Sequence, residues 1–207
     1  MKKRAVPDFR TEPIAALLDL QTETRLEGFR FEKQTCSTSL YGRRIFECEF
    51  RNVEFREGMP GTEFVDVIFD HCDFSNLHME ESSFRRCEFR SCRLVGAKLE
   101  HSGMRDVLLD HCLASYVNLS ASSWQTGEWR QCVMKEGYFT EMVQKNLSVH
   151  DCDFTGAEWH HTAMTGMDLS DSMLNGCAFT AEDLRGLTVN SQQAAHLAAL
   201  LGLKIKD

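Results

Sequence analysis

Large apolar residues recur at every fifth position over most of this chain. From Phe64 to Leu184, every position in steps of five is apolar except Gln144. An α-helix repeats near 3.6 residues and a β-strand near 2, so a strict period of five belongs to neither element. A second column lies two residues before the first and is mostly small, as at Cys72 and Ser102. The pattern predicts one large and one small inward-facing residue in each five-residue segment.

The cysteines supply a longer period. Five of them stand 20 residues apart in the small column: Cys72, Cys92, Cys112, Cys132 and Cys152. Four five-residue sides therefore make one coil, and successive coils stack like parallel strands about 4.8 Å apart. One coil cannot bury its own inner face, whereas stacked coils form a continuous apolar core. The sides are named here by their large residues: the first side holds Phe64 and Phe84, the second Phe69 and Phe89, the third Phe74 and Leu94, and the fourth Met79 and Leu99.

This alternation of large and small residues resembles the pentapeptide-repeat family. The resemblance implies an all-β solenoid, a right-handed quadrilateral parallel β-helix, for which we expect about eight coils. We divide the chain into an N-terminal cap segment at 1–39, the β-helix at 40–186 and a C-terminal helix and tail at 187–207. A short N-terminal helix is predicted from Thr11, which can serve as its N-cap, with Pro13 in its first turn.

Two irregularities interrupt the period. Phe55 and Phe64 are nine residues apart, and the glycines around Pro60 are typical of a loop. We expect a short loop at 56–61 that protrudes with Met59 at its tip, either as a harmless insertion or as a partner contact made by Glu57, Met59 and Pro60. At Gln144 we expect a bulge that lets the side chain turn away or bond to the backbone.

Composition narrows the possible functions. The formal net charge is -8, which argues against direct nucleic-acid binding, since that requires a basic surface. Residues Ala5 to Asp8 form no apolar core for export, and no apolar run reaches the roughly 18 residues of a membrane span. We therefore expect a cytoplasmic protein whose nine cysteines are reduced thiols.

Neither a metal site nor a catalytic site is predicted. A straight inner column of cysteines does not offer the four converging ligands of a zinc site, and buried thiols are poor redox centres. The sequence shows no nucleophile paired with a base and no phosphate-binding loop, so we expect no enzyme, no cofactor and no small-molecule substrate.

Acidic residues concentrate on two opposite sides of the predicted coil. On the second side they outnumber Arg90 and Arg130, and on the fourth side they outnumber Lys98. The candidate partner-binding residues of the second side are Asp70, Glu88, Asp110, Glu128, Asp151, Asp168 and Asp171. Those of the fourth side are Glu80, Glu100, Glu141 and Glu158.

The C-terminal tail predicts a helix over 191–201, capped by Asn190 or Ser191 and ended by Gly202. This helix is apolar nearly all round, so we expect one face to cover the last coil and another to meet a second copy of the chain. The residues expected in this dimer contact are Leu197, Leu200, Leu201, Leu203 and Ile205.

The tail also resembles that of the quinolone-resistance (Qnr-like) and toxin-immunity members of the family. It opens with Asp183-Leu-Arg-Gly-Leu, contains Gln-Ala at 193–194 and ends with Leu-Gly-Leu at 201–203. The resemblance implies a homodimer that mimics duplex DNA, binds DNA gyrase or topoisomerase IV, and protects it from quinolones or peptide toxins. The alternative is an interaction scaffold with another partner, for which Leu113, Val133 and Met173 on the third side form a candidate docking row.

Overall fold

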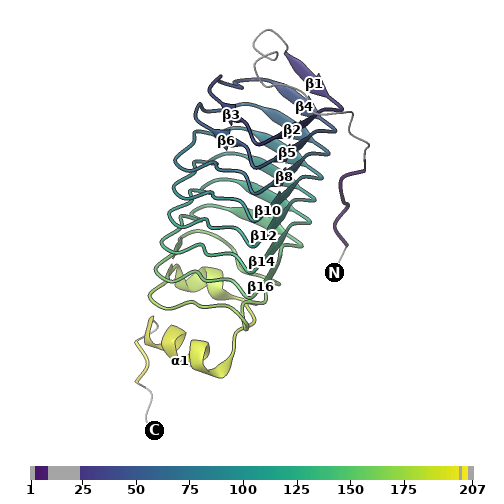
Figure 1. Cartoon of the computed structure of the whole chain (residues 1–207). Coiled ribbons are helices and arrows are strands. Elements are labelled where there is room, and N and C mark those ends of the chain that lie inside the picture. Colours follow the sequence, from purple (N-terminus) through teal and green to yellow (C-terminus); the bar gives the residue numbers. More distant parts are fainter. Residues whose placement is uncertain (1–2, 9–23, 201, 205–207) are drawn as a thin grey trace.

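The chain forms a four-sided parallel β-solenoid (Figure 1). The computed structural model describes residues 3–8, 24–200 and 202–204. Within these ranges there are about eight stacked coils and one C-terminal α-helix, which confirms the predicted fold class. The short helix predicted from Thr11 lies outside the described residues.

Two seven-stranded sheets form the first and second sides. The first side consists of β1 (Arg25–Glu27), β4 (Arg44–Phe46), β7 (Glu63–Val65), β9 (Ser83–Arg85), β11 (Gly103–Arg105), β13 (Ser123–Gln125) and β15 (Val143–Lys145). The second side consists of β2 (Arg30–Glu32), β5 (Glu49–Arg51), β8 (Ile68–Asp70), β10 (Glu88–Arg90), β12 (Leu108–Asp110), β14 (Glu128–Arg130) and β16 (Ser148–His150).

The third and fourth sides are held by shorter ladders. The third side has β3 (Thr35–Cys36) and β6 (Glu54–Phe55), continued by single bridges from Asp73 to Met173. The fourth side is a run of bridges from His78 that ends in β17 (Glu158–Trp159) and β18 (Ala178–Phe179). A 3-10 helix, η2 (Ala181–Leu184), and the helix α1 (Ser191–Leu200) follow the last coil.

The large inward residues stack in columns along the axis of the solenoid. On the second side the rings of Phe31, Phe50, Phe69 and Phe89 are stacked with successive centroid distances of 4.9, 5.2 and 4.8 Å. Phe64 and Phe84 stack in the same way on the first side at 4.8 Å. The stacking distance matches the spacing of hydrogen-bonded strands, because each ring sits on the equivalent strand of the next coil.

The small inward column makes hydrogen bonds as well as packing contacts. Ser82 Oγ donates to the carbonyl of Met59 at 3.0 Å, and Cys92 Sγ donates to the carbonyl of Phe69 at 3.4 Å. The same bond to the preceding coil recurs at Ser102 and at Cys112. A buried polar group is tolerated when it has a partner, which explains why serine and cysteine share this column.

The corners of the coil require left-handed backbone. Residues such as His71, Arg86, Tyr116 and Ala121 have φ between 51 and 60° although they are not glycine. Each such residue carries steric strain of roughly 1–2 kcal/mol, which the hydrogen bonds between coils hold in place. The corner at Ala121, for example, donates from its N–H to the carbonyl of Thr140 at 2.9 Å.

The coils begin earlier than the sequence predicted. β1, β2 and β3 all lie within 1–39, the segment assigned to an N-terminal cap. Leu26, Phe31 and Cys36 are buried in the inward column, and Leu26 lies opposite Ile45. The first two coils have 19 residues rather than 20, as the pairing of Arg25 with Arg44 shows, and this change of period hid them.

The predicted loop at 56–61 is wrong. Met59, its expected tip, has an exposed fraction of 0% and is the inward residue of the fourth side. The corner before it is one residue shorter than usual, and a Cβ on Gly58 would lie 2.9 Å from the carbonyl oxygen of His78. The glycine thus serves a tight corner, with Glu57 exposed and Pro60 half-buried beside it.

Gln144 satisfies its side chain without a bulge. β15 keeps its register, with Gln144 directly opposite Trp124. Its Nε2 donates to the carbonyls of Ala163 and Thr165 at 3.3 and 3.1 Å. The expected bond to the backbone is confirmed and the expected bulge is wrong. β15 is the last strand of the first side, so the amide takes carbonyls that the described sheet leaves free.

The corner strain predicts that Ala121→Gly stabilises the chain. Glycine removes the clash of Cβ at φ 54°, and we expect the free energy of unfolding to rise by about 0.5–1 kcal/mol. The matched control is Ala157→Gly, a fully buried inward residue outside the left-handed region, which should lower it by roughly 1 kcal/mol. Urea denaturation measures both, and equal losses in the two variants would contradict the strain argument.

The buried thiols predict resistance to modification. All nine cysteines are buried, and burial raises the pKa of Cys87 from its ordinary value of 9.0 to about 12. The native chain should therefore give no measurable reaction with a thiol-specific disulfide reagent at pH 8, and react fully once denatured. Because the folded pKa is raised, this contribution to stability is intact below pH 9.0 and is lost as the pH rises towards about 12. Rapid labelling of the native chain would contradict this.

Candidate protein-interaction surfaces

The second side presents two outward columns of residues, one on each flank of its inward column. In the later column acid and base alternate from coil to coil: Glu32, Arg51, Asp70, Arg90, Asp110, Arg130 and His150. In the earlier column acidic and aliphatic residues alternate: Glu49, Ile68, Glu88, Leu108 and Glu128. Opposite charges therefore face each other both along and across the strands.

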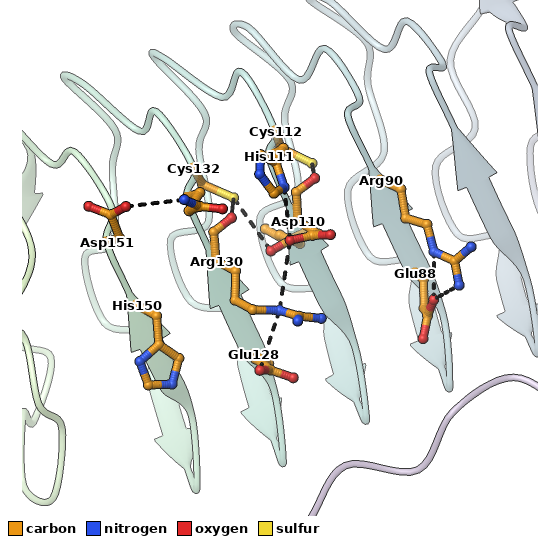
Figure 2. Close-up of polar contacts among 12 residues, drawn as sticks. Glu88, Arg90, Asp110, His111, Cys112, Glu128, Arg130, Cys132, His150 and Asp151 are labelled. Carbon is orange, nitrogen blue, oxygen red and sulfur yellow. Dashed lines mark hydrogen bonds and ion pairs between the residues drawn. The ribbon is translucent and has the colours of Figure 1, made fainter.

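Ion pairs neutralise most of this side (Figure 2). Arg90 pairs with Glu88 in the same strand. Arg130 Nε lies 3.4 Å from Glu128 and 3.7 Å from Asp110 of the neighbouring strand. The second side therefore does not form the continuous acidic surface that the count of charges predicted.

The remaining acids predicted on the second side also have partners. Asp70 and Asp110 contact the adjacent His71 and His111 at 2.7 and 3.1 Å. Asp151 accepts a hydrogen bond from Gln131 at 3.3 Å. Two further carboxylates lie near the lower coils: Asp171 is 3.7 Å from His150, and Asp168 accepts from the hydroxyl and the N–H of Ser170, which lower its pKa.

An N-terminal segment lies against the second side, which the sequence gave no means of predicting. Arg4 NH2 donates to Glu88 Oε1 at 2.7 Å, and its Nε lies 3.8 Å from Glu128 Oε2. The N–H of Ala5 donates to Asp106 Oδ1 at 3.2 Å. No period links Arg4 to the coils, so only the three-dimensional structure brings these residues together.

Glu88 is the most enclosed carboxylate of the second side. Its exposed fraction is 3%. Burial alone raises the pKa of this carboxyl, but the hydrogen bonds from Arg4 and Arg90 outweigh burial, and the pKa lies below its usual value. Glu88 is therefore ionised at neutral pH and depends on its two arginines.

The fourth side keeps its acidic charge. Glu80 contacts only His78, at 2.7 Å, and Glu100 accepts a hydrogen bond from Asn118 at 2.7 Å. The other acids there are exposed and make no ion pair with any described residue: Glu81, Glu141 and Glu158. Of the two acidic sides predicted, the fourth is the one with free negative charge.

The third side carries the predicted apolar row. Leu113 lies opposite Val133, followed by Asp153 and Met173 in the same ladder. Leu113 and Met173 have exposed fractions of 44% and 55%. Asp153 interrupts the row and pairs with Lys135 at 3.1 Å.

The C-terminal end of the solenoid is only partly covered. Asn190 caps α1: its Oδ1 accepts from the N–H of Gln193, whose Oε1 accepts from the N–H of Asn190. Gln193 Nε2 also donates to the carbonyls of Leu169 and Ser172, which fixes the start of the helix on the last complete coil. Gly202, at φ 73°, ends the helix as predicted.

Beyond this anchor, apolar residues remain open to solvent. A hollow of about 380 Å³ is lined by Leu174, Phe179 and Leu197, and a second of about 240 Å³ by Leu184 and Leu187 among others. Leu203 has an exposed fraction of 60%. Leu201, Ile205 and the side chain of Leu200, also predicted in a dimer contact, lie outside the described residues.

The described residues contain no convergent group of three or more histidine, cysteine, aspartate or glutamate side chains that could hold a metal ion. Within the same ranges, no helix has both the length and the apolar character needed to cross a bilayer.

Comparisons with known proteins agree with the repeat geometry. The family model of the pentapeptide repeat region matches residues 62–132. None of the curated proteins matches the chain. Among solved structures, a trypsin-treated form of QnrB1, a plasmid-mediated fluoroquinolone resistance protein, is 17% identical with a TM-score of 0.37, covering 88% of this chain and 99% of that one.

Two further solved structures extend the comparison. Full-length QnrB1 is 16% identical with a TM-score of 0.31, covering 84% of this chain and 100% of that one. HetL, a pentapeptide repeat protein involved in heterocyst differentiation regulation from the cyanobacterium Nostoc sp. strain PCC 7120, is 13% identical with a TM-score of 0.24, covering 79% and 86%. The matched family model and the four-sided coils with their five-residue period show that this chain belongs to the pentapeptide-repeat family.

Proposed function

We propose that this chain is a non-enzymatic protein-binding solenoid that presents its fourth side to a basic surface of a partner protein. The observation that carries the proposal is the contrast between the two acidic sides. Arginines neutralise the second side, whereas no lysine or arginine among the described residues pairs with Glu80, Glu100 or Glu158. Unpaired surface charge destabilises nothing locally but steers an oppositely charged partner towards the face that carries it.

The partner class proposed is a type II topoisomerase, DNA gyrase or topoisomerase IV, which the chain would bind as a mimic of duplex DNA. Proteins that bind DNA carry a basic footprint, to which a straight acidic face is complementary. The sequence of the C-terminal tail, from Asp183 to Leu203, supports this class. In this proposal the bound chain protects the enzyme from quinolones or peptide toxins and acts in the cytoplasm.

The proposed functional unit is a homodimer joined through the C-terminal ends. The half-exposed Leu174, Leu184 and Leu187 and the two hollows beside α1 leave apolar surface that a second copy would cover. A tail-to-tail dimer would also extend the acidic fourth side along a longer rod.

A different partner is the second candidate. It is favoured by the exposed row of Leu113, Val133 and Met173, since an apolar row on a rigid wall suits protein docking better than electrostatic mimicry does. This scaffold function needs no topoisomerase.

The topoisomerase proposal predicts protection in a supercoiling assay. Purified chain should restore gyrase activity in the presence of a quinolone or a peptide toxin. The double variant Glu100→Gln/Glu158→Gln should bind on the order of tenfold more weakly, because each lost charge removes up to about 1 kcal/mol. Asp70→Asn/Asp168→Asn on the second side is the control and should act like the wild type. Neither protection nor inhibition at micromolar concentrations would favour the scaffold function instead.

The dimer proposal predicts twice the mass of one chain in light scattering. Leu197→Glu and, separately, Leu203→Glu should give monomers, because each places a charge in the apolar end. Val143→Glu is the control: Val143 has an exposed fraction of 66% on the first side, so this variant should remain dimeric. A wild-type chain of single mass would reject the proposal.

A further inference from the structure

The N-terminal segment holds an arginine that is far more enclosed than its neighbours. Residues 3–8 run along the edge of the solenoid (Figure 1), and Lys3, Ala5, Val6 and Asp8 are exposed. The side chain of Arg4, in contrast, has an exposed fraction of 9%. Figure 2 shows this segment passing the ends of the strands that carry Glu88 and Glu128.

The site that encloses Arg4 is built from three acids on two elements of the coil. Glu88 and Glu128 stand in one column with Leu108 between them, so their carboxylates flank a gap one coil wide. Asp106, at the corner beside this gap, receives the N–H of Ala5 at 3.2 Å through its side chain. Its carbonyl oxygen is 3.5 Å from Arg4 NH1. We call Glu88, Asp106 and Glu128 the acidic notch.

An equivalent gap one repeat earlier shows what the acidic notch lacks. There Ile68 separates Glu49 from Glu88, and the corner acid is Asp66. Asp66 forms a two-pronged ion pair with Arg86, which is 20 residues ahead in the next coil.

At the acidic notch the corresponding corner residue is not an arginine. The residue 20 positions after Asp106 is Thr126, which has no charge to offer. Arg86, the corner residue of the preceding coil, is already taken by Asp66. The solenoid therefore builds an arginine acceptor without an arginine of its own, and Arg4 from the N-terminus fills it.

We propose that the acidic notch is a recognition site for an arginine within an extended peptide segment of a partner protein, and that Arg4 is an internal competitor for it. The guanidinium is recognised by Glu88 and Glu128, and the N–H of the following residue by Asp106. This second contact requires a peptide bond after the arginine, so the site selects Arg-Xaa in which Xaa is not proline. That the occupant is a protein rests on the function proposed above, whereas the occupancy by Arg4 does not.

The competition is tested with the full-length chain in two steps. First, hydrogen–deuterium exchange of residues 3–8 is compared in the wild type and in Glu88→Gln and Asp106→Asn, with Asp70→Asn as the control. The amide of Ala5 should exchange about tenfold faster in the first two variants and be unchanged in the control. Two acid variants are used because Glu88 is buried, and circular dichroism verifies that each is folded. Unchanged exchange in both folded variants overturns the proposal.

Second, a peptide of residues 1–8 is titrated into full-length Arg4→Ala and into the wild type, with binding followed by NMR shifts of the notch residues. The peptide should bind Arg4→Ala at least tenfold more tightly than the wild type, whose notch is filled, and Asp106→Asn in the Arg4→Ala background should abolish binding. A peptide with proline after the arginine and free arginine amide should both fail to bind. Equal binding to wild type and Arg4→Ala, no binding at millimolar peptide, or equal binding of arginine amide overturns the proposal. None of these results depends on the supercoiling assay, so the two proposals fail separately.

Discussion

The narrow interior of the four-sided coil is the constraint on which the rest of this structure depends. Each side has room for one large and one small inward residue, and the coils lie at the spacing of hydrogen-bonded strands. The stacked rings of Phe50, Phe69 and Phe89 fit that spacing because each adds one layer to a column. Turning four times per coil forces left-handed backbone at the corners, and residues such as His71 and Tyr116 accept it without being glycine. The coil tolerates the loss of one corner residue, as at Gly58, but not the loss of an inward one.

This constraint explains which features could be predicted from the sequence. The inward columns could be predicted because burial imposes a period on apolar residues, and so could the capped ends of α1, which rest on local chemistry at Asn190 and Gly202. The first two coils escaped because their 19-residue turn shifts the phase, so that Met59 was taken for a loop tip. Left-handed corners could not be predicted from the types of residue at the corners, since most of these residues rarely adopt that conformation.

The candidate surfaces were harder to predict, because charge acts between neighbours and not as a total for each side. The alternation of Asp70, Arg90, Asp110 and Arg130 is visible at a spacing of 20 residues, and following that single column would have shown the second side to be paired. The partner of the acidic notch could not be found in this way. Arg4 lies outside the repeat, so no spacing connects it to Glu88.

The position of Arg4 also bears on how strongly any partner could hold the second side. A site that is filled by its own chain binds a competitor with an apparent affinity reduced by the fraction of time for which the site is open. Because Arg4 is tethered to the same chain, its effective concentration is on the order of millimolar, so a partner must bring further contacts to displace it. The unpaired acids of the fourth side, Glu100 and Glu158, have no such internal competitor among the described residues. A basic partner would therefore meet the fourth side first and reach the acidic notch only when its affinity exceeds that of the tethered arginine.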